Sequence, residues 1–394
     1  MVGKKFIVIV GDGMADYPLE GLGGKTPLQA AQKPNIDFIA SEGKIGMIRT
    51  IPEGMSPGSA VANLAILGYD PRKYFTGRGP LEAGAMGIEL GHNDVAFRCN
   101  LITEKDGKMI DYSAGHVTTE EAVKLLGEVR KLKSGELHAG MTYRHIFLLR
   151  GNDANVGCAP PHDIVGEQIS TNLIPSKDET SRKLNELMLS SRKVLSEHPV
   201  NKNRVKLGKN PANMIWLWGP GRRPSLELFE KKYGLNGAMI SAVTLIRGLG
   251  VYTGMQIIDV PGATGYYDTN YEGKADSAIK ALDKNDFVYV HVEAPDEAGH
   301  AGDVEQKIKS IEDLDGRLVG RILNRAEGCT VAILPDHSTP INVGTHVSDP
   351  VPFAIYAAGI KGDGLKFDEA SAEKGSLGFI EGEKFIELLL RQWE

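Results

Sequence analysis

The stretch FVYVHVEAPDEAGHAGD, residues 287–303, contains the pattern that decides the fold. Phe287–Glu293 is a short apolar run rich in β-branched and aromatic side chains, which predicts a buried strand. Asp296 and His300 follow it in a D-x-x-x-H arrangement. In an open α/β sheet, ligands bind just beyond the carboxyl ends of the strands. This stretch therefore predicts a strand that delivers two potential metal ligands.

Three further runs of the same kind predict the rest of the sheet: Phe6–Val10, Thr330–Leu334 and Pro352–Ala357. Between the later runs, Val304–Ala326 has apolar residues at helical spacing, namely Ile308, Ile311, Leu314, Leu318 and Ile322. Strands that alternate with helices favour an α/β fold with a doubly wound, mostly parallel sheet.

The first predicted strand is separated from the others by most of the chain, so the middle of the chain is predicted to be an insertion. A length of 394 residues also favours two domains. We expect residues 1–90 and 265–394 to form one discontinuous domain and residues 91–264 to form a second, inserted α/β domain. Within the insertion, 95–102 and 146–149 are predicted strands, and 118–131 and 181–196 are predicted helices.

The composition argues against several classes of protein. With 45 basic and 51 acidic residues the formal charge is −6, whereas nucleic-acid binding usually needs a basic face. The three cysteines, Cys99, Cys158 and Cys329, form neither a disulfide framework nor a CxxC metal site. The opening MVGKKFIVIVGDG lacks the long apolar region of a signal peptide, and no stretch resembles a membrane span. These features predict a cytoplasmic protein.

Asp12, Asp336, His337 and His346 extend the metal-ligand pattern. Asp12 directly follows the first strand, Asp336 and His337 follow the strand at 330–334, and His346 lies shortly after them. Each acidic residue alone has a simpler interpretation, since Asp after a strand commonly caps a turn or helix. Turn chemistry does not require histidine, however, so the joint pattern favours a site for Mn²⁺, Zn²⁺ or Fe²⁺ rather than for Ca²⁺ or Mg²⁺ alone. His291 lies inside a strand and is interpreted as structural.

Ser59, in GMSPGSAVANLAILG, is the candidate nucleophile. A helix is predicted to begin there after Pro57-Gly58, and a helix N-terminus offers amide donors that suit a phosphoryl group. A metal ion at the hydroxyl would lower its pKa. The alternative is a helix-capping serine, a very common structural pattern.

Together, these motifs resemble the archaeal-type branch of the cofactor-independent phosphoglycerate mutases, in the alkaline phosphatase superfamily. The resemblance rests on GDGMAD, SPGSAVANLAILGYDP, GRGPLEA, DVAFRCN, PDEAGHAGD, PDHS and HVSDPVPF and covers nearly the whole chain. It implies an alkaline-phosphatase-like domain with two divalent metal ions, usually Mn²⁺ with Zn²⁺, Fe²⁺ or Mg²⁺ as alternatives. It also implies an inserted domain that holds the glycerate part of a small phosphorylated acid.

By this resemblance, one metal ion is expected on Asp296, His300 and His346. The second is expected on Asp12, Asp336 and His337, with the Ser59 hydroxyl completing its ligands. The implied reaction is the 2,3-bisphosphoglycerate-independent interconversion of 3-phosphoglycerate and 2-phosphoglycerate, through phosphoserine, in glycolysis and gluconeogenesis. Ala60 and Asn63 depart from the family pattern, which usually has Asp and often His at these two positions.

Basic residues that suit an acidic substrate are His116, Arg144, Arg222 (or its neighbour Arg223) and Lys274. His162 ranks below them.

Two alternative functions stay open. The same site could serve a phosphatase or a kinase, and homoserine kinase activity has been proposed for a bacterial sub-branch of this family. No G-x-x-x-x-G-K-[ST] loop is present, which disfavours ordinary ATP use. A metal-stabilised binding protein without activity is a further alternative. The sequence leaves the physiological substrate, the metal and the oligomeric state open.

Overall fold

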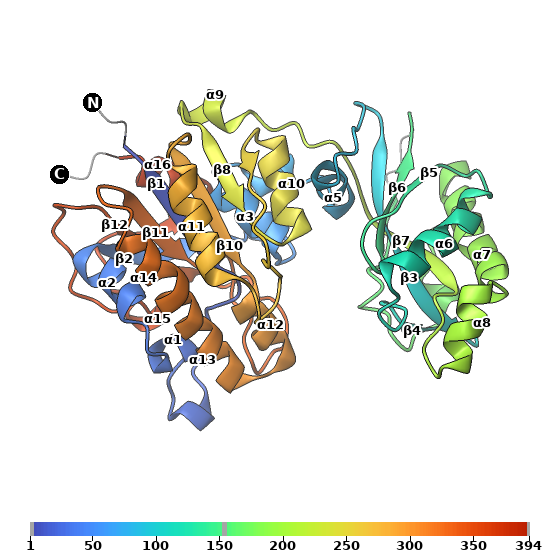
Figure 1. Ribbon diagram of the computed structural model, residues 1–394, viewed down its shortest axis with the longest axis horizontal. Coiled ribbons are helices and arrows are strands. Elements are labelled where there is room, and N and C mark those ends of the chain that lie inside the picture. The colour runs from blue at the N-terminus through green and yellow to red at the C-terminus, as the bar shows by residue number, and fades with distance from the viewer. Residues whose placement is uncertain (1–3, 152–155, 392–394) are drawn as a thin grey trace. The chain divides into compact units, whose positions relative to one another are not determined.

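The computed structural model describes residues 4–151 and 156–391, and the chain divides into two compact units (Figure 1). Unit 1 consists of Met1–Phe75 and Ser225–Glu394, and unit 2 of Thr76–Pro224. The boundaries expected at residues 90 and 264 differ from these. Residues 225–264 include two strands of the unit 1 sheet, which pair with β10 or with each other, and so they do not belong to the insertion.

Unit 1 is built around an eight-stranded sheet with the order β13-β2-β12-β11-β1-β10-β8-β9. The strand at 6–11, FIVIVG, lies inside the sheet, and all six of its residues are buried. It pairs in parallel with β10 on one side and β11 on the other. The predicted strand at 352–357 is present as β12, but it runs antiparallel to both of its neighbours. The strand bounds are β1 Phe6–Gly11, β2 Lys44–Arg49, β8 Gly237–Ile240, β9 Gln256–Ile257, β10 Phe287–Val292, β11 Thr330–Leu334, β12 Val351–Tyr356 and β13 Gly378–Glu381.

Helices cover both faces of this sheet (Figure 1). Ile7 and Ile9 pack into the main core with α2, α11 and the helical run of residues 304–323, while Tyr289 faces α3 on the opposite side. The α-helices of unit 1 are α1 Pro27–Ala30, α2 Pro34–Glu42, α3 Ser59–Ile66, α4 Pro71–Tyr74, α9 Phe229–Tyr233, α10 Thr244–Tyr252, α11 Tyr271–Ala281, α12 Ala294–Ala301, α13 Val304–Asp313, α14 Gly320–Leu323, α15 Glu369–Ala372 and α16 Phe385–Leu389.

The helix predicted at 304–326 contains one irregular turn. A π-helical segment, Leu314–Val319, separates α13 from α14. The carboxylate of Asp315, inside this segment, accepts hydrogen bonds from Ile36 N (2.6 Å) and Asn35 Nδ2 (2.8 Å). Asp315 therefore satisfies amides at the first turn of α2, whose own N-cap residue, Lys33, provides no side-chain cap.

Unit 2 contains a five-stranded antiparallel sheet in which β3 pairs with β4, β6 and β7. Alternate residues of β3, such as Phe97 and Cys99, enter a core with α6 and α7, and the intervening residues face the other side of the sheet. Within the described residues, no helix in either unit is both long and apolar enough to cross a membrane. The elements of unit 2 are α5 Arg78–Ala85, β3 Val95–Lys105, β4 Lys108–Asp111, α6 Thr119–Arg130, β5 Glu136–His138, β6 Arg144–Leu149, α7 Glu179–Ser196, α8 Pro199–Lys206 and β7 Met214–Arg222.

Candidate active site

The predicted metal ligands come together in unit 1, at the carboxyl ends of β1, β10 and β11. Asp12 directly follows β1, and its backbone N–H donates to the last residue of β10. Asp336 and His337 follow β11, and Asp296 and His300 lie on the short helix α12 that begins just after β10. Parallel strands end at the same edge of a sheet, so three distant segments of the chain deliver their polar side chains to one place.

Asp296, His300 and His346 form the first group. Nε2 of His300 lies 3.2 Å from Oδ2 of Asp296, and Nε2 of His346 lies 3.5 Å from its Oδ1. The two imidazoles are 3.0 Å apart, Nε2 to Nε2. His300 is held by Gly344, whose carbonyl oxygen lies 3.0 Å from Nδ1. The spacing of these donor atoms is that of side chains arranged around one small cation.

Asp12, Asp336 and His337 form the second group. Nε2 of His337 lies 3.4 Å from Oδ1 of Asp12 and 3.7 Å from Oδ2 of Asp336. The donor atoms of this group lie within 4.8 Å of one another, and His337 meets the same limit with Asp296 and His346. The two groups are therefore adjacent, and the imidazole of His337 lies close to the donor atoms of both.

Burial and like charges make this cluster electrostatically unfavourable without a cation. Burial, followed by the charges of Asp336 and Asp296, raises the pKa of Asp12 well above its usual range. Burial alone would also raise the pKa of Asp336, but the imidazoles of His337 and His291 lower it. Burial lowers the pKa of His337 to about 4, so this ring is a neutral donor at neutral pH. Asp12 and Asp336 are thus two buried carboxylates that repel each other, and a bound cation would relieve that repulsion.

The donor set fits divalent metal ions. Oδ1 of Asp12 is fully buried and has no hydrogen-bond partner among the described residues. Tetrahedral ligands with bonds of about 2.1 Å are separated by about 3.4 Å, and the separations given above lie between 3.0 and 3.7 Å. Mixed carboxylate and imidazole donors suit Mn²⁺, Zn²⁺ or Fe²⁺.

Ser59 lies beside the second group, at the start of α3. Its hydroxyl oxygen is 3.2 Å from Nε2 of His337 and 3.5 Å from Oδ2 of Asp12. The N-cap of α3 is Gly58, which has no side chain to cap the helix. The Ser59 hydroxyl therefore faces the cluster of carboxylates and imidazoles, which is where a nucleophile would need to be.

Several residues that the sequence analysis did not select contact the cluster. The Thr339 hydroxyl donates to Oδ1 of Asp296 and lies 3.3 Å from Nδ1 of His337. His291, interpreted from sequence as structural, is fully buried with Nε2 3.2 Å from Oδ2 of Asp12. The sequence did contain a signal for this role of His291. It lies two residues before the end of the predicted strand, close to the carboxyl end where the metal ligands gather.

Gly13 is required at its position by both conformation and space. Its φ is +64°, in the left-handed region that favours glycine. A Cβ there would lie 2.7 Å from both Cα and Oδ1 of Asp296. The absence of a side chain at Gly13 therefore allows the loop after β1 to approach α12 closely enough to join the two groups.

In unit 2, one face of the sheet carries a second polar cluster, centred on Trp218. The guanidinium of Arg98 lies 4.2 Å from the centre of the indole, and that of Arg78 lies 5.7 Å from it. Arg98 also pairs with Glu82, Nε to Oε1 at 3.1 Å. Burial, with the nearby charges of Arg144 and Arg78, lowers the pKa of Arg98 to about 10. Arg78 and Arg98 lie in the motifs GRGPLEA and DVAFRCN, but sequence alone does not separate them from surface arginines.

Two of the predicted substrate-binding residues lie close to this cluster. Arg144 stacks on the Tyr143 ring at 5.2 Å, and His116 packs edge-on against the same ring at 6.4 Å. His162, which ranked lower in the sequence analysis, packs against Trp218 at 5.3 Å. Tyr112 packs against both the Tyr143 ring (6.0 Å) and the His162 ring (6.1 Å), and it therefore connects these residues to the cluster around Trp218.

The other two predicted substrate-binding residues lie elsewhere. Arg222 pairs with Val95, five residues along β3 from the partner of Arg144, which corresponds to about 17 Å of strand. Lys274 is completely buried in unit 1, and its ammonium group donates to the carbonyl oxygen of His291 at 3.1 Å. Burial lowers the pKa of Lys274 to about 8. Its partner is the backbone of a central strand.

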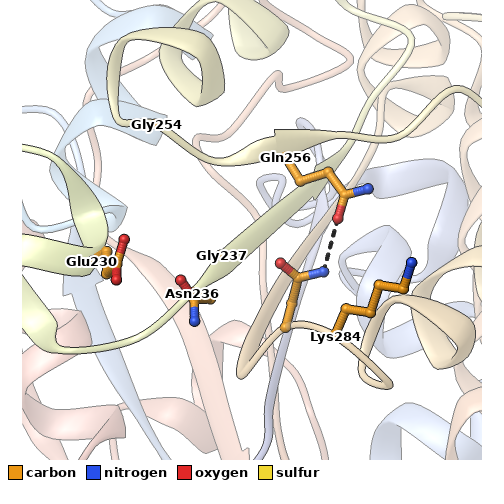
Figure 2. A pocket seen from close by; sticks show the side chains of 7 residues that line it. Glu230, Asn236, Gly237, Gly254, Gln256 and Lys284 are labelled. Atoms are coloured by element: carbon orange, nitrogen blue, oxygen red, sulfur yellow. Dashed lines mark hydrogen bonds between the residues drawn. The ribbon is translucent and has the colours of Figure 1, made fainter.

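A separate hollow of about 260 Å³ lies at the amino ends of β8 and β10 (Figure 2). Asn285 donates to Gln256 across it at 3.0 Å. Its position is the opposite edge of the sheet from Asp12 and Ser59, so it has no part in the site described above. It is lined by Glu230, Asn236, Gly237, Gly254, Gln256, Lys284 and Asn285.

Comparison with known proteins gives a consistent assignment. Residues 40–201 match the family model described as 2,3-bisphosphoglycerate-independent phosphoglycerate mutase. The protein of that name from Methanothrix thermoacetophila is 54% identical over 98% of this chain and 99% of its own length. One from Methanothermobacter thermautotrophicus is 52% identical, covering 99% of this chain and 98% of the relative.

Two solved structures resemble the whole chain. The PH0037 protein of Pyrococcus horikoshii has a TM-score of 0.84 and 31% identity, covering 99% of this chain and 97% of that one. The cofactor-independent phosphoglycerate mutase of Thermoplasma acidophilum has a TM-score of 0.67 and 30% identity, covering 98% and 99%.

Proposed function

The chain belongs to the family of 2,3-bisphosphoglycerate-independent phosphoglycerate mutases and is an isomerase, and from this we propose that it interconverts 3-phosphoglycerate and 2-phosphoglycerate through a phosphoserine at Ser59. The observation that carries the proposal is the position of the Ser59 hydroxyl, 3.2 Å from His337 and 3.5 Å from Asp12 at the N-terminus of α3. Helix N-termini favour bound phosphoryl groups.

We assign Asp296, His300 and His346 to one divalent metal ion and Asp12, Asp336, His337 and Ser59 to another. Mn²⁺ is the first metal to test at both positions. Metal ions bound there would neutralise the negative charge of the phosphoryl group during its transfer, and they would lower the pKa of the serine hydroxyl. Two features of Asp12 support the assignment, because a bound cation would relieve both. Its buried Oδ1 has no hydrogen-bond partner in the part of the chain that the structure describes, and the pKa of its carboxyl group is raised.

In the forward direction, the Ser59 oxygen forms a bond to phosphorus and loses its proton. The bond between phosphorus and the 3-oxygen of the substrate breaks, and that oxygen takes up a proton. The glycerate then turns, and its 2-hydroxyl oxygen bonds to phosphorus and loses its proton. The bond between phosphorus and the Ser59 oxygen breaks, and the serine oxygen takes up a proton, which restores the free hydroxyl. Atoms and charge balance over the two transfers, so no second phosphate donor is required.

Unit 2 supplies the groups that suit an acidic substrate. We assign Arg144 and His116 to the binding of its anionic groups, and we add Arg98 and Arg78. Arginine forks match carboxylate and phosphate geometry, and the arrangement of these side chains around Trp218 and Tyr143 supports the assignment. Lys274 is omitted because it is buried against the His291 backbone. A cytoplasmic location stays a prediction from the sequence.

One assay separates the mutase from its alternatives. Purified protein with Mn²⁺ and 3-phosphoglycerate should form 2-phosphoglycerate, detected by a coupled reaction, without added 2,3-bisphosphoglycerate. Release of inorganic phosphate as the main product would instead identify a phosphatase. Phosphorylation of homoserine with ATP, without mutase turnover, would identify a kinase. Either of these two results contradicts the proposal.

A further inference from the structure

Asn63 lies one helical turn after Ser59 and is completely buried. Its side-chain nitrogen donates to the Ser59 carbonyl oxygen at 2.8 Å and to Oδ2 of Asp336 at 2.7 Å. Its side-chain oxygen accepts from the Tyr289 hydroxyl at 2.5 Å. A single amide therefore connects the helix that carries the candidate nucleophile, a carboxylate of the second metal-ligand group, and β10.

The chemistry of the partners fixes the direction of this amide. The ionised Asp336 carboxylate can only accept hydrogen bonds, so the amide NH₂ must face it. The amide oxygen then faces Tyr289, whose hydroxyl must be the donor. Burial, with the charges of Asp336 and Asp12, raises the pKa of Tyr289 well above its usual value, which keeps the proton on the hydroxyl.

These contacts also orient Asp336. Its Oδ1 accepts from the backbone N–H of His337 at 2.9 Å and of Gly13 at 3.3 Å. Its Oδ2 accepts from Asn63. Hydrogen bonds on both oxygens restrict rotation of the carboxylate, and Oδ2 keeps a second lone pair that Asn63 does not use. Nε2 of His337 lies 3.7 Å from this oxygen.

We propose that Asn63 and Tyr289 are a positioning pair, in which Tyr289 sets the amide of Asn63 and Asn63 sets Asp336 relative to Ser59. Both side chains are completely buried, so neither is assigned a contact with the substrate. The alternative role is purely structural, with the pair satisfying buried polar groups and contributing only to stability. The proposal rests on the proposed function in taking Asp336 as a metal ligand and Ser59 as the nucleophile.

The main test is Tyr289→Phe, which removes one oxygen atom and keeps the ring. Tyr271→Phe is the matched control, because the Tyr271 hydroxyl is also buried in unit 1 but has no hydrogen-bond partner among the described residues. Mn²⁺ is titrated calorimetrically into the metal-free protein, and the binding event at Asp336 is identified as the one that Asp336→Asn removes. Outer-sphere partners of metal ligands typically contribute about 10- to 100-fold to affinity or activity.

We expect Tyr289→Phe to weaken that binding event by about 10-fold or more, and Tyr271→Phe to leave it unchanged. In the enzyme saturated with Mn²⁺, kcat should fall while KM for phosphoglycerate stays unchanged. The substitution alters the position of Asp336 but removes no contact with the bound substrate. Asn63→Ala should have at least the same effect. The double variant should be no worse than Asn63→Ala, since Tyr289 acts only through Asn63.

A folded Tyr289→Phe protein whose Mn²⁺ affinity and kcat stay within about twofold of the wild type would overturn the proposal. Effects of the two substitutions that multiply in the double variant would also overturn it. If Asn63→Ala does not fold, Tyr289→Phe alone decides. The metal titration does not depend on mutase activity, so a protein without that activity would refute the proposed function and leave this test intact.

Discussion

Replacing Ser59 by alanine should separate the chemistry of the site from the stability of the fold. A helix-capping serine contributes about 1 kcal/mol of stability. The cap position of α3 is held by Gly58, however, and among the described residues the Ser59 hydroxyl has two long contacts, 3.2 Å to His337 and 3.5 Å to Asp12. The free energy of unfolding of the metal-free protein should therefore change by no more than about 0.5 kcal/mol. Turnover should fall by at least ~10³-fold, or about 4 kcal/mol of barrier, because the attacking atom is lost.

The assay combines urea unfolding of the metal-free protein with the coupled measurement of 2-phosphoglycerate. Ser56→Ala, an exposed serine three residues earlier, is the control and should leave both quantities unchanged. Acid quenching of the wild-type reaction should trap phosphate on the peptide that contains Ser59. Ser59→Ala protein with more than about a tenth of wild-type turnover would refute the phosphoserine mechanism. A loss of 1 kcal/mol or more of stability would show instead that the hydroxyl caps the helix.

Three other predictions follow from the same structure. Chelation should abolish turnover and lower the melting temperature, and Mn²⁺ at about 100 times its Kd should restore about 2.7 kcal/mol, measured by calorimetry. Burial lowers the pKa of His145 to about 4, below its unfolded value of 6.5, so the fold favours the neutral ring. Stability should therefore fall by about 3 kcal/mol as the pH decreases from 6.5 to 4, and His145→Asn should lose this dependence in urea unfolding. Asp315→Ala should destabilise unit 1 by about 1–3 kcal/mol, measured in the same way, because two amides at the start of α2 lose their acceptor. Asp315→Ala with wild-type stability would contradict this role.

The sequence was most informative where local chemistry and fold agree. The apolar runs at 6–10, 287–293 and 330–334 form central strands because a strand buried on both faces must be apolar throughout. The side chains after these strands meet at one edge because the strands are parallel. The predicted α/β fold with a mostly parallel sheet is confirmed on these grounds.

Other features depend on contacts that no local pattern encodes. An apolar run gives no strand direction, so the antiparallel pairing of β12 could not be predicted. The boundary at residue 224 depends on β8 and β9, which are short and lie close to the insertion in sequence. The sequence marks Asn63 only as a departure from the family pattern, and its contact with Asp336 depends on tertiary structure.

The basic residues illustrate the same limit. Lys274 has the charge of a ligand-binding residue, but it lies on the face of α11 that is buried in unit 1. Arg98 alternates with core residues along β3, and only the pairing of β3 with β7 places it on Trp218. The face of the helix or strand on which a long charged side chain lies decides where that side chain points. The sequence identifies this face only when the register of the helix or strand is known.

The central position of β1 has a consequence for synthesis of the chain. Phe6 pairs with Phe287 and Thr330, so β1 has both neighbours only after residue 334 has been made. Unit 2 is complete at residue 224, which is 334 − 224 = 110 residues earlier. At roughly 5–20 residues per second, the ribosome needs on the order of 5 to 20 seconds for that interval. During translation, the apolar FIVIVG segment therefore lacks its neighbouring strands throughout this interval, although the insertion has already been synthesised. We expect a nascent-chain chaperone to bind this segment.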